Sequence, residues 1–193
     1  MKETAFGTIA FILFMAYDLE QAGVISHRFH RMTRYYFTVG TGILLVVTGL
    51  LLWRTVPQIL PFHEKQICFL ILAIMFFLLL IYTLFFALPF AETYVEQDAH
   101  KTYDKKMYAL CRHPGVLWFA GFYMCLWLAF GTKPMLVMAL WFSFLNFCYV
   151  VLQDFYTFPK IFSDYRDYQK HVPFLIPNGK SLKRCLDTFK ESR

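Results

Sequence analysis

Five long apolar segments divide this chain, and they constrain its fold more than any other feature of the sequence. They run over residues 6–17, 35–53, 67–90, 115–131 and 135–152. A run of about 18 apolar residues is long enough to cross the hydrocarbon core of a bilayer as a helix. The composition agrees, because 58% of the 193 residues are hydrophobic and 23 are phenylalanine. A soluble domain of this length would leave much of that surface exposed as apolar patches.

The first segment is the weakest of the five, because Asp18 and Glu20 interrupt its end, and it extends to residue 24 at most. It lacks the basic start and the small-residue cleavage site of a secretory signal peptide, so we interpret it as a membrane span. The sequence therefore predicts an all-α fold, a polytopic membrane protein with about five transmembrane helices.

The domain organisation is simple, since the chain has no internal repeat and no low-complexity linker. We expect a single membrane domain over residues 1–193. Within it, residues 1–90 hold three N-terminal spans. Residues 91–178 hold a polar loop, a helical hairpin and a C-terminal segment, and residues 179–193 form a polar tail.

Basic residues predict how the spans are oriented. If five spans alternate sides, 15 of the 19 lysines and arginines fall on the side that holds the 91–114 loop and the C-terminus. The positive-inside rule places that side in the cytoplasm, so we expect a multi-pass protein with its N-terminus outside. Anionic membrane lipids account for the net charge of +6, and no nucleic-acid partner is expected.

The five cysteines are an odd number without C-x-x-C spacing, so neither a disulfide framework nor a metal site is expected.

An Arg-His-Pro tripeptide at the start of the fourth segment suggests a binding site. Pro114 suits the first turn of a helix, and the free N–H groups of that turn favour an anion. Arg112 can hold a carboxylate at two points, and His113 can donate, accept or move a proton near neutral pH. The alternative is that Arg112 and His113 are anchors that extend to the membrane surface.

A second polar group follows the fifth segment. Four polar side chains recur at helical spacing and should share roughly one face: Asn146, Tyr149, Gln153 and Asp154. A carboxylate at the end of a membrane helix is a candidate functional group, although Asp154 could also be an ordinary interfacial residue. Tyr165 and Tyr168, by themselves, would be read as an aromatic belt at the membrane surface.

These motifs follow one another in a definite order over residues 95–178. His100 precedes Tyr108 by seven intervening residues, and three more lead to Arg112-His113-Pro114. The hairpin, the Gln153-Asp154 pair, a Tyr-x-x-Tyr element and the "VPFLIP" stretch come next. This order resembles the integral-membrane methyltransferases related to isoprenylcysteine carboxyl methyltransferase and the phospholipid N-methyltransferases.

The resemblance implies a cytoplasmic pocket for S-adenosyl-L-methionine and a lipophilic methyl acceptor, isoprenoid or phospholipid-like, that arrives from the bilayer. It implies that His100 and Tyr108 line the cofactor pocket, and that Arg112, His113 and Pro114 hold the cofactor's carboxylate end. Asp154 is the carboxylate available to the cofactor's sulfonium. No catalytic residue is assigned, although His113 or Asp154 could act as a base for an amine or hydroxyl acceptor.

The chain departs from the family pattern at several positions. Met107 stands where the family has glycine, Gly115-Val116 where it has tyrosine or Met-Tyr, and Phe174 where it often has arginine. Gln153-Asp154 replaces a pair of glutamates. Two alternatives therefore stay open: a membrane reductase related to the sterol reductases, with a similar Arg-His-Pro element and a nicotinamide cofactor, or a non-catalytic scaffold of the same fold.

Overall fold

The computed structural model describes residues 2–24, 33, 35–59, 61–86 and 101–191. Every regular element in these ranges is a helix. The long helices are α1 (Lys2–Gln21), α3 (Tyr36–Thr55), α4 (Glu64–Ile81), α7 (Pro114–Phe130) and α8 (Lys133–Leu152). The short ones are η2 (Val56–Gln58), η3 (Tyr82–Phe86), α6 (Met107–Leu110), η4 (Gln153–Thr157), α9 (Phe158–Ile161), α10 (Tyr165–His171) and α11 (Gly179–Glu191).

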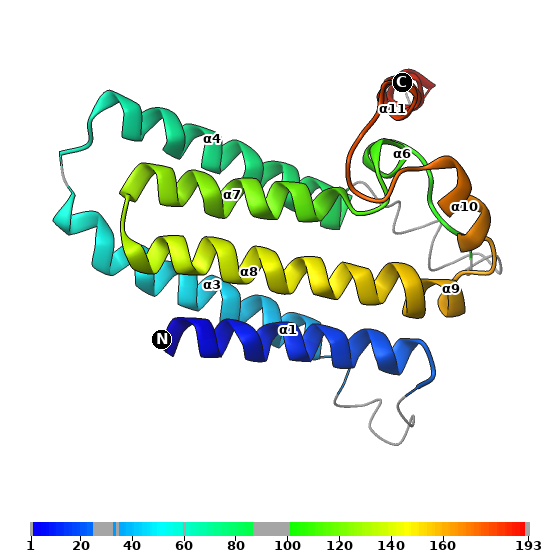
Figure 1. The fold of residues 1–193 in the computed structure, drawn as a ribbon, viewed down its shortest axis with the longest axis horizontal. Coiled ribbons are helices and arrows are strands. Elements are labelled where there is room, and N and C mark those ends of the chain that lie inside the picture. Colours follow the sequence, from blue (N-terminus) through cyan, green and yellow to red (C-terminus); the bar gives the residue numbers. More distant parts are fainter. Residues whose placement is uncertain (1, 25–32, 34, 60, 87–100, 192–193) are drawn as a thin grey trace.

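The five long helices form one bundle (Figure 1). Helix α4 packs along α7, α7 along α8, α8 along α1, and α1 along α3. The N-terminus and the tight turn between α7 and α8 lie at one end of the bundle, and the C-terminal helix α11 lies at the other. Gly131 makes that turn possible with a left-handed backbone at φ 66°, which costs glycine nothing.

Three helices are long and apolar enough to cross a membrane: Tyr36–Thr55, Glu64–Phe86 and Lys133–Ile161. Their outer surfaces carry large apolar side chains that are more than half exposed, among them Val46, Ile71 and Leu140. Such side chains would be unfavourable in water and are suited to contact with lipid. The chain is therefore a helical membrane protein. Helix α7 is apolar but only 17 residues long, and α1 is not among the three.

Small residues let the helices of the bundle approach closely, as is common in membranes. An added Cβ at Gly40 of α3 would lie 2.6 Å from the ring of Phe14 on α1. A Cβ at Gly121 of α7 would lie 2.9 Å from the ring of Phe76 on α4. The rings that fill these gaps belong to one continuous hydrophobic core. Within it, Thr48 Oγ1 lies 2.7 Å from Tyr123 Oη, at hydrogen-bond distance.

The short helices α6, α9, α10 and α11 all lie at the end of the bundle opposite the α7–α8 turn (Figure 1). Helix α8 continues through the π-helical η4 into α9, and α10 turns back toward the start of α7. This arrangement gathers residues from the two halves of the polar sequence, 101–114 and 153–191, at one end of the molecule.

Candidate functional site

The Arg-His-Pro tripeptide lies in an extended strip of chain between α6 and α7. Pro114 is the first residue of α7, and it disfavours a helical backbone at His113, whose φ and ψ are −126° and 62°. The strip pairs with the segment after α10: the Arg112 N–H donates to the Pro173 carbonyl at 2.9 Å, and the His113 N–H to the Phe174 carbonyl at 3.3 Å. The "VPFLIP" stretch therefore holds the backbone that carries the motif.

Asp154 is the centre of the site. Arg112 donates to it at two points, with Nε 2.7 Å from Oδ1 and Nη2 2.9 Å from Oδ2. The Tyr165 hydroxyl donates to Oδ1 at 2.7 Å, and His113 Nε2 lies 3.2 Å from the same oxygen. Gln169 Nε2 lies 3.2 Å from Oδ2 and also donates to the Asp154 carbonyl at 2.9 Å. Five donors thus surround one carboxylate.

This ion pair is removed from water. Asp154 is 0% exposed, and the Arg112 side chain is 10% exposed. Burying two charges costs several kcal/mol, and only close geometry with satisfied hydrogen bonds offsets that cost. Arg112 meets the condition, because Nη1 also donates to the carbonyls of Val172 at 2.8 Å and Gln169 at 3.1 Å. Four of its five N–H groups are therefore bonded to this chain, and one on Nη2 makes no bond to the residues described.

Aromatic rings enclose the side chains of Arg112 and His113. The His113 ring stacks on Phe158, with centroids 5.8 Å apart, and meets the edge of Phe174 at 5.4 Å. The Arg112 guanidinium carbon lies 5.5 Å from the Phe174 ring centre, a cation–π contact. Burial lowers the pKa of His113 below its ordinary value, against the opposing effect of Asp154, so the imidazole is neutral at pH 7. Phe174 is therefore part of the site's wall.

Tyr108 lies on α6, beside the ion pair but without contact to it. Its hydroxyl donates to the Thr83 carbonyl at 3.1 Å in the π-helical end of the α4 helix. Its own carbonyl accepts from the Tyr168 hydroxyl at 2.7 Å. Burial raises the pKa of both tyrosines, so each stays a hydroxyl donor at any ordinary pH. The two residues join α6 to the end of α4 and to α10.

The π-helical turn η4 separates the side chains of Gln153 and Asp154. Gln153 Nε2 donates to Asp18 Oδ2 on α1 at 2.7 Å, whereas Asp154 faces Arg112 on the other side. A π-helical turn inserts an extra residue into a helix and is often found at functional sites. The expectation that the two residues share a face was therefore wrong. Each instead contacts a different neighbouring helix or segment.

A hollow in the described part of the chain lies next to Val172, whose carbonyl accepts a hydrogen bond from Arg112. This hollow, of about 440 Å³, lies over the outer side of α10, where it is bordered by Tyr168 and Val172. Its wall carries the three carboxylates of Asp104, Asp164 and Asp167, and Arg184 of α11 also lines it. Asp164 Oδ1 is held by the Thr102 N–H at 2.8 Å and the Thr102 hydroxyl at 2.7 Å.

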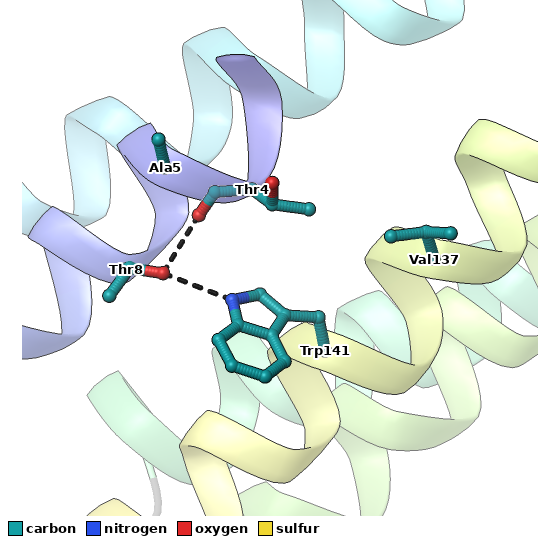
Figure 2. A pocket seen from close by; sticks show the side chains of 5 residues that line it. All are labelled: Thr4, Ala5, Thr8, Val137 and Trp141. Carbon is teal, nitrogen blue, oxygen red and sulfur yellow. Dashed lines mark hydrogen bonds between the residues drawn. The ribbon is translucent and has the colours of Figure 1, made fainter. Parts of the chain in front are cut away.

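The second hollow, of about 350 Å³, lies between α1 and the start of α8, near the other end of the bundle (Figure 2). Trp141 Nε1 donates to the Thr8 hydroxyl at 3.0 Å across it, and that hydroxyl donates to the Thr4 carbonyl at 2.9 Å. Val137 and Ala5 complete a lining with no ionisable side chain. Because no ionisable side chain lines it, this hollow shares no reactive group with the Arg112 site.

The structure brings together Arg112, His113, Pro114 and Asp154, as the sequence motifs suggested. Tyr108 reaches this group only indirectly: its carbonyl bonds the Tyr168 hydroxyl, and the Tyr168 ring contacts Tyr165, which bonds Asp154. His100 lies outside the described residues. Sequence reasoning missed the roles of Tyr165 and Gln169, which complete the shell around Asp154. The belt interpretation of the two tyrosines was wrong, because Tyr165 is 2% and Tyr168 8% exposed. Their Tyr-x-x-Tyr spacing was the available signal.

No group of three or more His, Cys, Asp or Glu side chains is placed to hold a metal ion within the part of the chain that the structure describes. Comparisons with protein-family models, with curated proteins and with solved structures find no match to this chain.

Proposed function

We propose that this chain is an S-adenosylmethionine-dependent methyltransferase that acts on a lipophilic acceptor at the membrane surface. The observation that carries the proposal is the contact of Asp154 with both Arg112 and His113. These residues are about 40 positions apart and belong to the two motifs on which the resemblance depends. Buried ionisable groups at the end of membrane helices are energetically costly and usually functional.

The residues around the pair suit a cofactor that carries both signs of charge. The uncommitted Nη2 hydrogen of Arg112 is a donor for a carboxylate. The three carboxylates of the neighbouring hollow suit positively charged groups, and Tyr108 and Tyr103 offer aromatic faces nearby. When bound, the cofactor would supply an electrophilic methyl group on its sulfonium. The two-point contact predicted between Arg112 and the cofactor is made instead with Asp154, so Arg112 acts first as a positioning residue.

The protein's own contribution would be to hold, orient and shield the reactants, which supplies most of the acceleration in a direct transfer. Asp154 fixes Arg112 and the His113 ring, and the rings of Phe158 and Phe174 exclude water around them. Asp154 accepts too many hydrogen bonds to serve as a base. Neutral His113 is the better candidate to take a proton from an amine or hydroxyl acceptor. A carboxylate or thiolate acceptor would need no base.

We further propose that all five long helices span the bilayer, with the N-terminus outside and the Arg112 site at the cytoplasmic face. The acceptor would then reach the site from the bilayer, between helices, and the cofactor from the cytoplasm. Only 11% of the most apolar stretch of the helix Glu64–Phe86 is buried inside the bundle, which supports contact of this helix with lipid.

Calorimetric titration of the purified protein with S-adenosylmethionine, and separately with NADPH, tests the proposal. We expect binding of the first and not of the second. Arg112→Ala and Tyr108→Phe should weaken that binding, the former by at least tenfold, or about 1.4 kcal/mol. Arg54→Ala is the matched control, because Arg54 is an exposed arginine at the opposite end of the bundle, where it pairs with Glu3.

Transfer of a radiolabelled methyl group to a farnesylated cysteine and to phosphatidylethanolamine then identifies the acceptor class. A short water-soluble analogue of each should react poorly, because each buried CH₂ contributes about 0.8 kcal/mol. Binding of NADPH alone would replace the proposal with a reductase, and binding of neither cofactor would leave a scaffold.

A further inference from the structure

Helix α11 differs from the rest of the molecule in direction and in composition. It begins at a capping box, in which the Ser181 N–H donates to Asn178 Oδ1 at 2.9 Å and the Asn178 N–H to Ser181 Oγ at 3.0 Å. Figure 1 shows α11 end-on, whereas α1, α4, α7 and α8 are seen from the side. The helix therefore runs across the direction of the spans, which is the orientation of a helix that lies parallel to a membrane surface.

The sides of α11 form three stripes. Ser181 and Cys185 are buried against α6, and Phe189 packs beside them. At 3.6 residues per turn, Leu182 and Leu186 lie on the next stripe, and they are 51% and 55% exposed. The exposed Lys183 and Lys190 continue round the helix beyond the leucines.

This order of buried, apolar and basic stripes is typical of a helix that inserts shallowly into a bilayer. The leucines would reach the boundary between headgroups and acyl chains, and the lysines beside them would remain at the level of the phosphates. Ile176, just before the helix, is 82% exposed and extends the apolar surface.

The neighbours of α11 place it at the depth of the membrane surface. Trp118, in the second turn of α7, packs against the same small cluster as Cys185 and Phe189. Its indole N–H donates to the Thr83 hydroxyl at 3.1 Å, near the end of the α4 span. Tryptophan is enriched at the boundary between hydrocarbon and headgroups. Because α11 contacts this residue, it lies level with the ends of the spans rather than beyond them in water.

We infer that α11 is an interfacial helix that binds the anionic phospholipid surface beside the Arg112 site. Leu182 and Leu186 enter the bilayer, and Lys183 and Lys190 contact lipid phosphates. Each lysine contributes more to membrane binding when the leaflet is anionic. This inference does not depend on methyl transfer or on any cofactor.

Lipid binding by α11 would also hold the segment that carries Tyr108. The Thr188 hydroxyl accepts a hydrogen bond from the Lys106 N–H at 2.9 Å. Lys106 has a φ of 53°, a left-handed conformation that costs a non-glycine residue about 1 kcal/mol or more. Ala109 and Leu110 of α6 pack on Cys185. Contacts with α11 therefore support α6 at its start and along its buried side.

Spin labels on introduced cysteines test the inference in purified protein reconstituted in lipid nanodiscs, in a background with Cys68→Ser and Cys148→Ser that leaves only the buried cysteines. Leu186→Cys and Asp187→Cys are a matched pair, because the two exposed residues are adjacent but project from different sides of the helix. Accessibility to oxygen and to a water-soluble nickel complex reports depth. We expect the Leu186→Cys label to be in the bilayer and the Asp187→Cys label in water, with the melting temperature of the protein unchanged.

Discs of different lipid composition test whether α11 prefers an anionic membrane. The Leu186→Cys label should lie deeper in discs that contain phosphatidylserine than in discs of phosphatidylcholine alone. The double change Lys183→Glu, Lys190→Glu should remove that difference. A Leu186→Cys label that is in water in both kinds of disc overturns the inference, as does spin–spin coupling that shows two copies paired through this face. If the depth of the label changed neither with lipid charge nor with the lysine substitutions, the proposed preference of α11 for anionic lipid would be overturned.

Discussion

At the scale of single residues, the shorter side chain at position 154 has a clear structural role. Aspartate there lies against Arg112, His113 and Tyr165 without any exposed surface. A glutamate would carry one more methylene into a space that five donors already fill, and additions to a packed interior are usually unfavourable. Aspartate therefore fits this ion pair better than the longer glutamate would.

Breaking the ion pair should strongly destabilise the protein. Arg112→Ala leaves a buried carboxylate unpaired, and Asp154→Asn leaves a buried guanidinium, so each should lower the free energy of unfolding by about 3–5 kcal/mol. Arg112→Lys should recover part of this, because an ammonium cannot make the planar two-point contact. Unfolding in mixed micelles measures the effect, and the Arg112→Ala, Asp154→Ala double-mutant cycle isolates the coupling. Arg54→Ala, at an exposed pair, should cost less than about 1 kcal/mol.

The pH dependence of stability should report on His113. Because burial holds its pKa below the ordinary 6.5, the unfolded chain binds the proton first as the pH falls. Stability should therefore be complete above pH 6.5 and decrease below it, by at most about 1.4 kcal/mol per pH unit for one proton. His113→Gln should flatten the melting temperature between pH 5 and 7. The exposed His171→Gln is the control, and equal slopes in the two variants would contradict the assignment.

The sequence indicated only part of this residue-level site. Pro114 marked a helix start, and Arg112 and His113 were candidate functional residues because ionisable groups are rare beside hydrocarbon. The shell around Asp154 could not be predicted, because Tyr165 and Gln169 reach it only through the fold of the chain after α9. The carbonyls of residues 172–174, which hold Arg112 and His113, are placed by the same fold. The bond from Gln153 to Asp18 was equally hidden, since it joins residues 135 positions apart.

At the scale of elements, hydropathy located the long helices well. The apolar segment 35–53 corresponds to α3, 115–131 to α7, and 135–152 to α8, each within about two residues. Pro114 and Gly131 fixed the two ends of α7 because one suits a first helical turn and the other a left-handed C-cap. The π-helical turns η3 and η4 have no sequence signal of that kind. They depend on contacts with neighbouring helices.

Close packing of α1 against α8 gives a prediction for Gly7. A Cβ at this position would overlap the ring of Phe142, which is fully buried, so Gly7→Ala should destabilise the bundle by about 1–3 kcal/mol. Gly49→Ala on α3 is the matched control, since nothing lies within 4 Å of its added Cβ. That change should be neutral or stabilise by up to about 1 kcal/mol.

Unfolding of the two variants in mixed micelles makes the comparison, and Phe142→Leu in the Gly7→Ala background should restore part of the loss. If Gly7→Ala and Gly49→Ala behaved alike, the close approach of α1 to α8 would be wrong.

At the scale of the whole molecule, the bundle has all its ionisable candidates for chemistry at one end. The other end holds the α7–α8 turn, the exposed Arg54–Glu3 pair and the apolar hollow of Figure 2. This polarity follows from the chain path, because residues 101–114, which lead into α7, and residues 153–191, which follow α8, lie at the same end of the bundle (Figure 1). The positive-inside rule then predicts which end of the bundle faces the cytoplasm, which the helix arrangement alone does not indicate.

That direction can be measured with two lysines at opposite ends of the bundle. Lys133 is the first residue of α8 and Lys180 the second residue of α11. We expect a membrane-impermeant maleimide to label Lys133→Cys on intact cells, and Lys180→Cys only after permeabilisation, in a Cys68→Ser background. The reverse pattern would invert the orientation and place the Arg112 site outside, away from a cytoplasmic cofactor. Labelling of both variants on intact cells would mean that the chain crosses the bilayer an even number of times between them, which five spans do not allow.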